Sequence, residues 1–386
     1  MSKVLFIPLN GNHVSIFKNV IDALKSEYTV LCHDRISDAP YYHTEQTLKT
    51  KRIPYIHFER ELKRSTRDNL AKQIADFFRM KKLIRNTIKK ISPSQIVLGI
   101  DNDPVARVIV KEAKKNGIGT ILIPEGLIRL YWYTGSTRDI SDWVYKGLEC
   151  FGIYLRYSKY GTSGCDRILV SGRRAMNILK KQGVPEGKMA IVGQPKYDEF
   201  VRKLESRPAE KTERRTYLFA ASNTVVKDDA NVTFLRKLIE CIESLGFFLI
   251  VKLHPRTPQT PEDIYKAIGK EKSAGFEIIK EGDDTLTILQ KSYGLITINS
   301  TVMIEALMLN KEGIAVNYLA EGDRLDYDEY DAIYCIDREQ DILEVLKMSA
   351  IIRKSDQNKR RLLEDELYRL DGKAGVRVAN LIDVMV

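Results

Sequence analysis

Short apolar runs alternate with longer amphipathic stretches along the whole chain. Residues 3–9 are apolar, residues 13–25 are amphipathic, and residues 28–32 are apolar again. Short apolar runs predict buried strands, and stretches with helical periodicity predict helices. A strand–helix–strand order indicates a parallel sheet with right-handed crossovers. The opening run is therefore interpreted as a first strand and not as a secretory signal.

The same alternation continues to the end of the chain. In the first half, it predicts strands at 95–100, 120–123, 167–171 and 189–192, helices at 104–116 and 174–182, and two helices within the charged stretch 61–91. In the second half, it predicts strands at 216–220, 247–253, 276–279, 294–298 and 313–317, helices at 231–245, 285–291 and 301–309, and a helical segment after 338. The pattern is typical of the α/β class.

A chain of 386 residues is too long for one hydrophobic core, since single cores stop growing near roughly 250–300 residues. The best linker is the polar stretch 203–215, which contains Pro208. We therefore expect two Rossmann-like domains, at 1–205 and 206–386, that face each other across a cleft. Ligands of open α/β sheets bind at the carboxyl ends of the strands, so functional residues should directly follow strands.

Composition narrows the class of protein. Hydrophobic residues make up 44% and charged residues 30%, which is typical of a soluble globular protein, and no apolar stretch reaches the ~20 residues of a membrane span. The five cysteines are scattered and never spaced CxxC, which favours a reduced, cytoplasmic protein without a zinc or redox motif. The net charge of +10 suits phosphate ligands or anionic membranes; without a nucleic-acid-binding motif, we expect no nucleic-acid partner.

One histidine follows a strongly predicted strand of the second domain. His254 is followed by a proline and lies between Lys252 and Arg256. Cationic donors around an imidazole at a strand end suit a phosphate group that must be bound and stabilised as it leaves. The alternative is a structural histidine that hydrogen-bonds a nearby carbonyl.

Two further polar loops of the second domain are candidates for donor binding. Ser300 and Thr301 precede an apolar helix, where they either form a plain N-cap or bind an anion together with the helix amides. Glu305 within that helix is either an acceptor for a ribose hydroxyl or a residue of the solvated stripe. Ser222 and Asn223 form a weaker polar loop that could also touch the donor.

The first domain offers a carboxylate after a strand. Glu125 could act as a general base towards an acceptor hydroxyl, and Gly126 would allow the backbone to approach a ligand closely. The alternative is a turn with an exposed glutamate. The loop after the first strand is compatible with acceptor binding; its residues are Asn10, Gly11, Asn12 and His13. The sequence contains no GxGxxG, Walker A or HExxH motif. It therefore does not support a nicotinamide-dependent enzyme, a P-loop protein or a zincin.

These residues resemble the motifs of a known family. The order Glu125-Gly126, His254-Pro255 and Ser300-Thr301 is similar to the acidic-Gly, His-Pro and Ser/Thr motifs of GT-B glycosyltransferases with cytidine-activated donors. These include bacterial sialyltransferases, polysialyltransferases, capsule Kdo transferases and CDP-glycerol glycerophosphotransferases. The stretch 192–198 also resembles their Gly-x-Pro-x-x-Asp segment. One departure is Pro124, which stands where the family often has a second acid.

The resemblance implies a GT-B enzyme that transfers a sugar or phosphate-linked unit from a CMP- or CDP-linked donor to a hydroxyl of a glycan or glycolipid. Glu125 would then be the base, while His254, Ser300 and Thr301 would hold the leaving phosphate. No metal ligand cluster is visible, so we expect a metal-independent reaction without a cofactor.

A different chemistry on the same fold remains open. His254-Pro255-Arg256-Thr257 also resembles a segment of non-hydrolysing UDP-N-acetylglucosamine 2-epimerases. Those enzymes typically carry Gly-Thr-Arg-Pro-Glu near the start and Ser-Gly-Gly in the last domain. This chain has the residues 9–12 (Leu-Asn-Gly-Asn) and 300–302 (Ser-Thr-Val) instead.

An aromatic segment, residues 127–165, contains both tryptophans of the chain. It either contributes to ordinary core packing or seats the protein peripherally on the inner face of a membrane that carries a lipid-linked acceptor. A basic cluster is either a solvated helix face or a contact for anionic lipid; its residues are Arg79, Lys81, Lys82, Arg85, Lys89 and Lys90.

Overall fold

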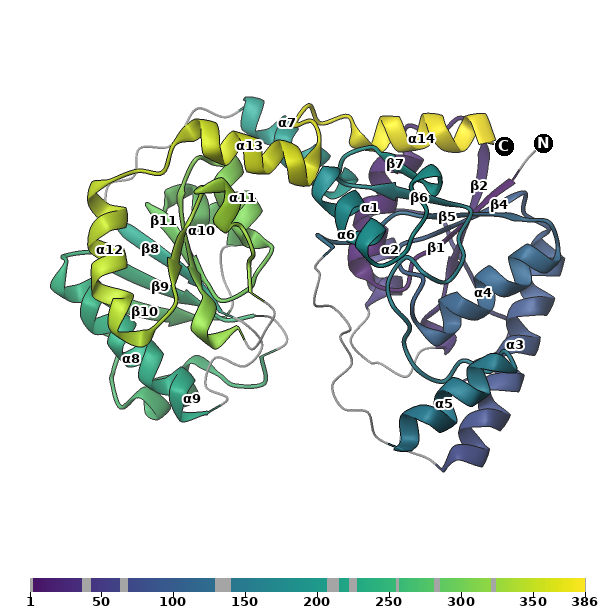
Figure 1. Ribbon diagram of the computed structural model, residues 1–386, viewed down its shortest axis with the longest axis horizontal. Coiled ribbons are helices and arrows are strands. Elements are labelled where there is room, and N and C mark those ends of the chain that lie inside the picture. Colours follow the sequence, from purple (N-terminus) through teal and green to yellow (C-terminus); the bar gives the residue numbers. More distant parts are fainter. Residues whose placement is uncertain are drawn as a thin grey trace. The chain divides into compact units, whose positions relative to one another are not determined.

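A computed structural model describes most of the chain as two compact units (Figure 1). The first comprises Met1–Glu205 and Asp365–Val386, and the second comprises Ser206–Glu364. The described residues exclude 1–2, 37–42, 63–68, 129–139, 207–214, 222–227, 255–256, 281–284, 321–323 and 386, and the side chains of 36, 140–142 and 205–206. Each unit is built on a parallel sheet with helices, which confirms the expected architecture of two α/β domains.

The first unit contains a seven-stranded parallel sheet with the order β3-β2-β1-β4-β5-β6-β7. Its strands are β1 (Lys3–Ile7), β2 (Glu27–Cys32), β3 (Ile56–His57), β4 (Gln95–Leu98), β5 (Gly119–Leu122), β6 (Arg167–Val170) and β7 (Met189–Ile191). The sheet is buried because its short apolar strands are covered on both faces, as in other parallel sheets.

Several helices of the first unit begin at recognisable side-chain caps. They are α1 (Gly11–Ile21), α2 (Thr44–Thr50), α3 (Leu70–Ile91), α4 (Pro104–Lys115), α5 (Ile140–Cys150), α6 (Arg173–Lys181), α7 (Asp198–Ser206) and α14 (Ala374–Met385). Asn10 caps α1 by accepting from the amide of His13, and Asp103 caps α4 ahead of Pro104. The described part of the charged stretch 61–91 forms a single helix, α3, and not the two helices predicted from sequence.

The last segment of the chain packs on the first unit, whereas the sequence-based boundary placed it in the second domain. Both carboxylate oxygens of Asp198 accept from the first amides of α14, those of Ala374 (3.0 Å) and Gly375 (2.7 Å). A side chain at Gly375 would clash with the backbone of Asn19 on α1. Close approach and a buried cap therefore fix α14 against α1, a link between residues far apart in sequence that no local pattern predicts.

The second unit contains a six-stranded parallel sheet with the order β10-β9-β8-β11-β12-β13. Its strands are β8 (Thr216–Ala220), β9 (Phe248–Lys252), β10 (Phe276–Ile279), β11 (Gly294–Thr297), β12 (Glu312–Val316) and β13 (Tyr334–Ile336). Its helices are α8 (Asp229–Ser244), α9 (Pro261–Ile268), α10 (Thr285–Lys291), α11 (Val302–Met308), α12 (Ile342–Ile351) and α13 (Asp356–Leu367), whose last turn belongs to the first unit.

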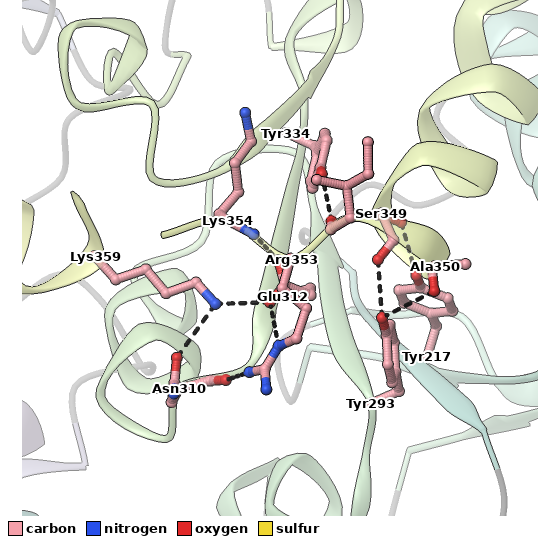
Figure 2. Close-up of polar contacts among 11 residues, drawn as sticks. Tyr217, Tyr293, Asn310, Glu312, Tyr334, Ser349, Ala350, Arg353, Lys354 and Lys359 are labelled. Atoms are coloured by element: carbon pink, nitrogen blue, oxygen red, sulfur yellow. Dashed lines mark hydrogen bonds and ion pairs between the residues drawn. The ribbon is translucent and has the colours of Figure 1, made fainter. Parts of the chain in front are cut away.

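A buried ion pair lies at the amino end of β12 (Figure 2). Glu312 accepts from the Nζ of Lys359 (2.7 Å), from the Nε of Arg353 (3.1 Å) and from the amide of Lys354 (3.1 Å). Both Glu312 and Lys359 are almost fully buried. These contacts fix the connection between α12 and α13 to the sheet, at the edge opposite to the strand ends that carry Ser300.

Among the described residues, no helix is long and apolar enough to cross a bilayer.

Candidate functional site

The strand ends of the first unit bring three predicted residues into direct contact with a fourth, Glu125. Asn10 donates from Nδ2 to Glu125 Oε2 (2.6 Å), and Asn12 donates from Nδ2 to Glu125 Oε1 (2.6 Å). His13 places its Nε2 2.9 Å from Glu125 Oε2. The loop after β1 and the loop after β5 therefore meet at the carboxyl edge of the sheet, because β1 and β5 both flank β4. Gly11 begins α1, and Gly126 lies in the turn after Glu125.

The buried ring of His13 has a defined proton arrangement. The amide of Leu9 donates to His13 Nδ1 (3.0 Å), so this nitrogen must present its lone pair. The proton of the neutral ring is then on Nε2, which faces the Glu125 carboxylate. The backbone thereby orients His13 so that Nε2 faces Glu125 as a hydrogen-bond donor.

The carboxyl group of Glu125 is held ionised. Burial raises its pKa, but the hydrogen bond and the charge of His13, together with the hydrogen bonds from Asn10 and Asn12, outweigh burial and lower the pKa to about 2. Its side chain keeps 30% exposure, so a ligand can still reach it. An ionised carboxylate with these three donors is a fixed hydrogen-bond acceptor, and its role as a general base stays a prediction.

A glycine at the end of β4 makes room for the imidazole. A Cβ atom at Gly99 would lie 2.5 Å from the His13 ring, which real structures do not tolerate. The carbonyl of Gly99 accepts from the hydroxyl of Tyr160 (2.6 Å). Gly99 therefore packs closely against the His13 ring, and the Tyr160 hydroxyl binds the Gly99 carbonyl. No local pattern predicted either role, because a glycine after a strand also marks an ordinary turn.

Other buried polar residues follow the neighbouring strands and were missed by sequence reasoning. Asp101 is fully buried and accepts from the amides of Gly161 (2.8 Å) and Ser163 (3.0 Å); burial raises its pKa to about 6 in spite of these bonds. Asn102 is fully buried, and neither atom of its amide has a partner. Asp101 therefore fixes the loop 158–163, and Asn102 adds unused hydrogen-bonding capacity beside it.

Two further strand ends complete this edge. His33 follows β2 and is buried, which is the main reason that its pKa is lowered to about 4 and that it is neutral near pH 7. Gln194 follows β7 and donates to the carbonyl of Pro124 (2.9 Å), the residue before Glu125. Gln194 thereby fixes the backbone that carries the carboxylate. Five strands therefore contribute polar residues to one edge of the sheet. Asn10 follows β1, His33 follows β2, Asn102 follows β4, Glu125 follows β5 and Gln194 follows β7.

In the second unit, the predicted donor-binding residues also follow strands. His254 is half-buried after β9, and its carbonyl accepts from the amide of Thr257 (2.9 Å). The Nζ of Lys252 donates to the carbonyl of Lys280 (3.2 Å). The sequence-based placement of His254 and Lys252 at a strand end thus matches the strand bounds, while their role in binding a donor stays a prediction.

The loop after β11 is partly used for local structure. Ser300 Oγ accepts from the amide of Val302 (3.3 Å), and the Ser300 amide donates to Thr297 Oγ1 (3.3 Å). Thr301 occupies the N-cap position without a side-chain cap bond, and Glu305 is half-buried in α11. Ser222, Asn223 and Arg256 lie outside the described residues.

Within the described part of the chain, no group of three or more His, Cys, Asp or Glu side chains could hold a metal ion.

Comparisons with known proteins identify the fold. No protein-family model matches the chain, and no curated protein matches it. The UDP-GlcNAc 2-epimerase from Methanocaldococcus jannaschii, solved with UDP-GlcNAc and UDP, is 15% identical, with a TM-score of 0.63 over 100% of both chains. The enzyme of the same name from Neisseria meningitidis, bound to UDP-GlcNAc, is 12% identical, with a TM-score of 0.64 over 99% of this chain and 100% of that one.

A glycosyltransferase of kitacinnamycin is also similar, with 14% identity and a TM-score of 0.63 over 100% of this chain and 99% of that one. Likeness at this level shows the two-domain GT-B fold, as expected from the sequence.

The expectation that the protein is a glycosyltransferase with a cytidine-linked donor is wrong. Several of the most similar solved structures are UDP-GlcNAc 2-epimerases, which favours the alternative chemistry. The physical reason is that the three motifs are short and mark strand ends. Open α/β sheets place polar residues at the carboxyl ends of their strands whichever nucleotide they bind, so the order of these short motifs does not identify the nucleotide base.

Proposed function

We propose that the protein is an enzyme of UDP-linked N-acetylhexosamines that inverts the configuration at C2 of the sugar. The observation that carries the proposal is the similarity of the whole chain to UDP-GlcNAc 2-epimerases solved with UDP-GlcNAc. The resemblance of the segment 254–257 to an epimerase segment supports it. Fold alone does not define a reaction, so the site residues must account for the chemistry.

The reaction makes two demands. Inversion at C2 first requires a base that takes the C2 proton, with the electron pair forming a C1–C2 double bond as the C1–O bond to UDP breaks; a proton then returns to the other face of C2 while UDP adds back to C1. Second, the diphosphate that leaves and returns requires donors that stabilise its charge. Lys252 and His254, at the end of β9, suit the diphosphate. Glu125, ionised and still accessible, suits a hydroxyl or amide N–H of the sugar.

This chain differs from the epimerases at the start of the first unit. Residues 9–12 replace their Gly-Thr-Arg-Pro-Glu sequence, and two of these residues, Asn10 and Asn12, donate to Glu125. The side-chain amides of Asn10 and Asn12 are uncharged, so they do not neutralise the negative charge of Glu125. We therefore propose that the carboxylate contacts the sugar directly, and that sugars differing at C3 and C4 should be included in the assay.

The test is an NMR assay in D2O with UDP-GlcNAc and related UDP-hexosamines. We expect a C2 epimer and deuterium at C2 in both sugars, because the C2 proton exchanges with solvent during inversion. A thermal-shift panel should show stabilisation by UDP and not by CMP or CDP. The proposal fails if no UDP-hexosamine gains deuterium at C2, or if only cytidine nucleotides stabilise the protein.

Variants connect the assay to the site. His254→Ala should reduce turnover strongly at unchanged folding, while Lys272→Ala, an exposed position of the same unit, should leave turnover unchanged. The reaction is proposed to need neither metal nor cofactor, so turnover should persist in EDTA.

A further inference from the structure

Helix α5 exposes an apolar face. Trp143 is 74% exposed, Val144 is 46% exposed, and Phe151, directly after the helix, is 84% exposed. At 100° per residue, these three lie within about 100° of one another around the axis, and with Gly147 and Cys150, which are exposed as well, the set spans about 120°. We call this set the α5 stripe. An amphipathic helix on a protein surface usually buries such a stripe and exposes its polar side.

The opposite side of α5 is fixed to the protein by polar contacts. Glu149 accepts from the NH1 nitrogen of Arg107 on α4 (2.7 Å), and the guanidinium of Arg156 lies 3.7 Å from the ring centre of Tyr145. Half-buried Leu148 is on the same side. The helix therefore cannot turn its stripe inward without breaking an ion pair and a cation–π contact.

The neighbouring helices carry most of the chain's net positive charge. Helices α3 and α4 together contain eleven Lys and Arg residues against two carboxylates, an excess of nine in a chain of net charge +10. Both carboxylates are buried and paired: Asp76 with Arg79, and Glu112 with Arg85 and Lys115. Burial, and after it nearby cations such as Lys115, lower the pKa of Lys81.

Helices α5, α3 and α4 belong to one region of the first unit (Figure 1). The ring of Tyr154, shortly after α5, lies 6.1 Å from the ring of Phe77 on α3 and 4.1 Å from the Arg107 guanidinium on α4. Phe78, the next residue on α3, is half exposed, and Lys146 lies over the Trp143 ring. Exposed aromatic rings thus stand among lysines and arginines.

We propose that this region docks the protein on an anionic phospholipid bilayer. The side chains of Trp143, Val144 and Phe151 enter the boundary between headgroups and acyl chains, and the cations of α3 and α4 contact lipid phosphates. A nucleic acid would use the cations but would leave the α5 stripe in water. A protein partner would need acidic residues around an apolar centre, whereas a bilayer with anionic lipid supplies both properties by itself.

The test measures binding of the full chain to vesicles. Vesicles of phosphatidylcholine with phosphatidylglycerol should sediment the protein, vesicles of phosphatidylcholine alone should not, and salt should weaken the binding. In Trp132→Phe, Trp143 is the single tryptophan, and its emission should shift to the blue and be quenched by brominated acyl chains. Failure to bind anionic vesicles at low salt, or an unchanged Trp143 emission on binding, would overturn the proposal.

Matched variants separate the two parts of the surface. Trp143→Glu combined with Phe151→Glu should weaken binding at least about tenfold, since two large apolar side chains are lost from the contact. Ile351→Glu, an equally exposed apolar position of the second unit, should have no effect. Lys82→Glu with Lys89→Glu should abolish the preference for anionic lipid, while Lys272→Glu should not. Equal loss in the control variants, or binding to a DNA duplex that competes with vesicles and leaves Trp143 emission unchanged, would contradict bilayer docking.

Discussion

The Nε2 atom of His13 lies 2.9 Å from Oε2 of Glu125, and the amide of Leu9 occupies the other ring nitrogen. The imidazole is therefore a backbone-oriented donor, and the carboxylate is a fixed acceptor. Two loops that are distant in sequence build this pair because β1 and β5 both lie next to β4. In the proposed reaction, the pair would position a sugar, and its proton would stay on His13.

Glu125→Gln should reveal the ionised state of the carboxyl group. Relative to the ordinary value of 4.5, the lowered pKa of about 2 means that Glu125 stabilises the folded state above pH 4.5 and loses this contribution as the pH falls through about 2. The contribution is on the order of 3 kcal/mol. The difference in unfolding free energy between the two proteins, measured with urea from pH 7 to pH 2.5, should therefore shrink towards acid.

Glu186→Gln provides the control, because Glu186 is an exposed partner of Lys180. Exposed pairs contribute little, about 0–1 kcal/mol, so its curve should parallel that of the unmodified protein. A Glu125→Gln curve that also stays parallel would show that Glu125 is not ionised more readily in the folded state.

Gly99→Ala should disturb His13 from behind. The added Cβ would overlap the ring, and because the ring is fully buried we expect a loss of about 1–3 kcal/mol of stability. In nitrogen NMR, the unmodified protein should show His13 with Nδ1 unprotonated and Nε2 protonated, and the variant should lose this pattern. Gly187→Ala, where an added Cβ meets nothing, is the matched control. An unchanged His13 spectrum in Gly99→Ala would mean that close packing against Gly99 does not fix the His13 ring.

Strand ends could be predicted because apolar runs of a parallel sheet are short and end in polar residues. The predicted strand 294–298 is one residue longer than β11 at its end, and the predicted helix 301–309 is one residue longer than α11 at each end. In contrast, the position of α14 depends on Asp198 and Gly375, whose contacts lie far apart in sequence. Local periodicity carries no information about such a contact.

The candidate site could be predicted only in part. Asn10, His13 and Glu125 were expected at the same edge because each follows a strand, and the structure brings them into contact, while the role of Glu125 as a base stays a prediction. Gly99 and Asn102 were missed because their roles depend on which side chain packs against them. The nucleotide was misjudged because short motifs at strand ends are shared by different reactions.

Asp198→Ala should loosen α14 specifically. The carboxylate accepts from the first two amides of the helix, and loss of such a cap costs about 1–2 kcal/mol. Hydrogen exchange should rise in residues 374–385 more than in the sheet of the first unit. Glu199→Ala, an exposed neighbour paired with Lys203, should leave exchange in that helix unchanged. Uniformly faster exchange throughout the first unit would show that α14 does not open separately.

Substitutions at the buried pair of the second unit should have unequal effects (Figure 2). Glu312→Leu leaves the buried ammonium of Lys359 without its carboxylate, and breaking a buried pair in this way costs about 3–5 kcal/mol. Lys359→Met should cost less, because Glu312 keeps Arg353 and the amide of Lys354. The double variant should be more stable than the sum of the two losses predicts, since no unpaired lysine remains. Urea unfolding of the four proteins completes the cycle; additive losses would contradict a direct coupling between Glu312 and Lys359.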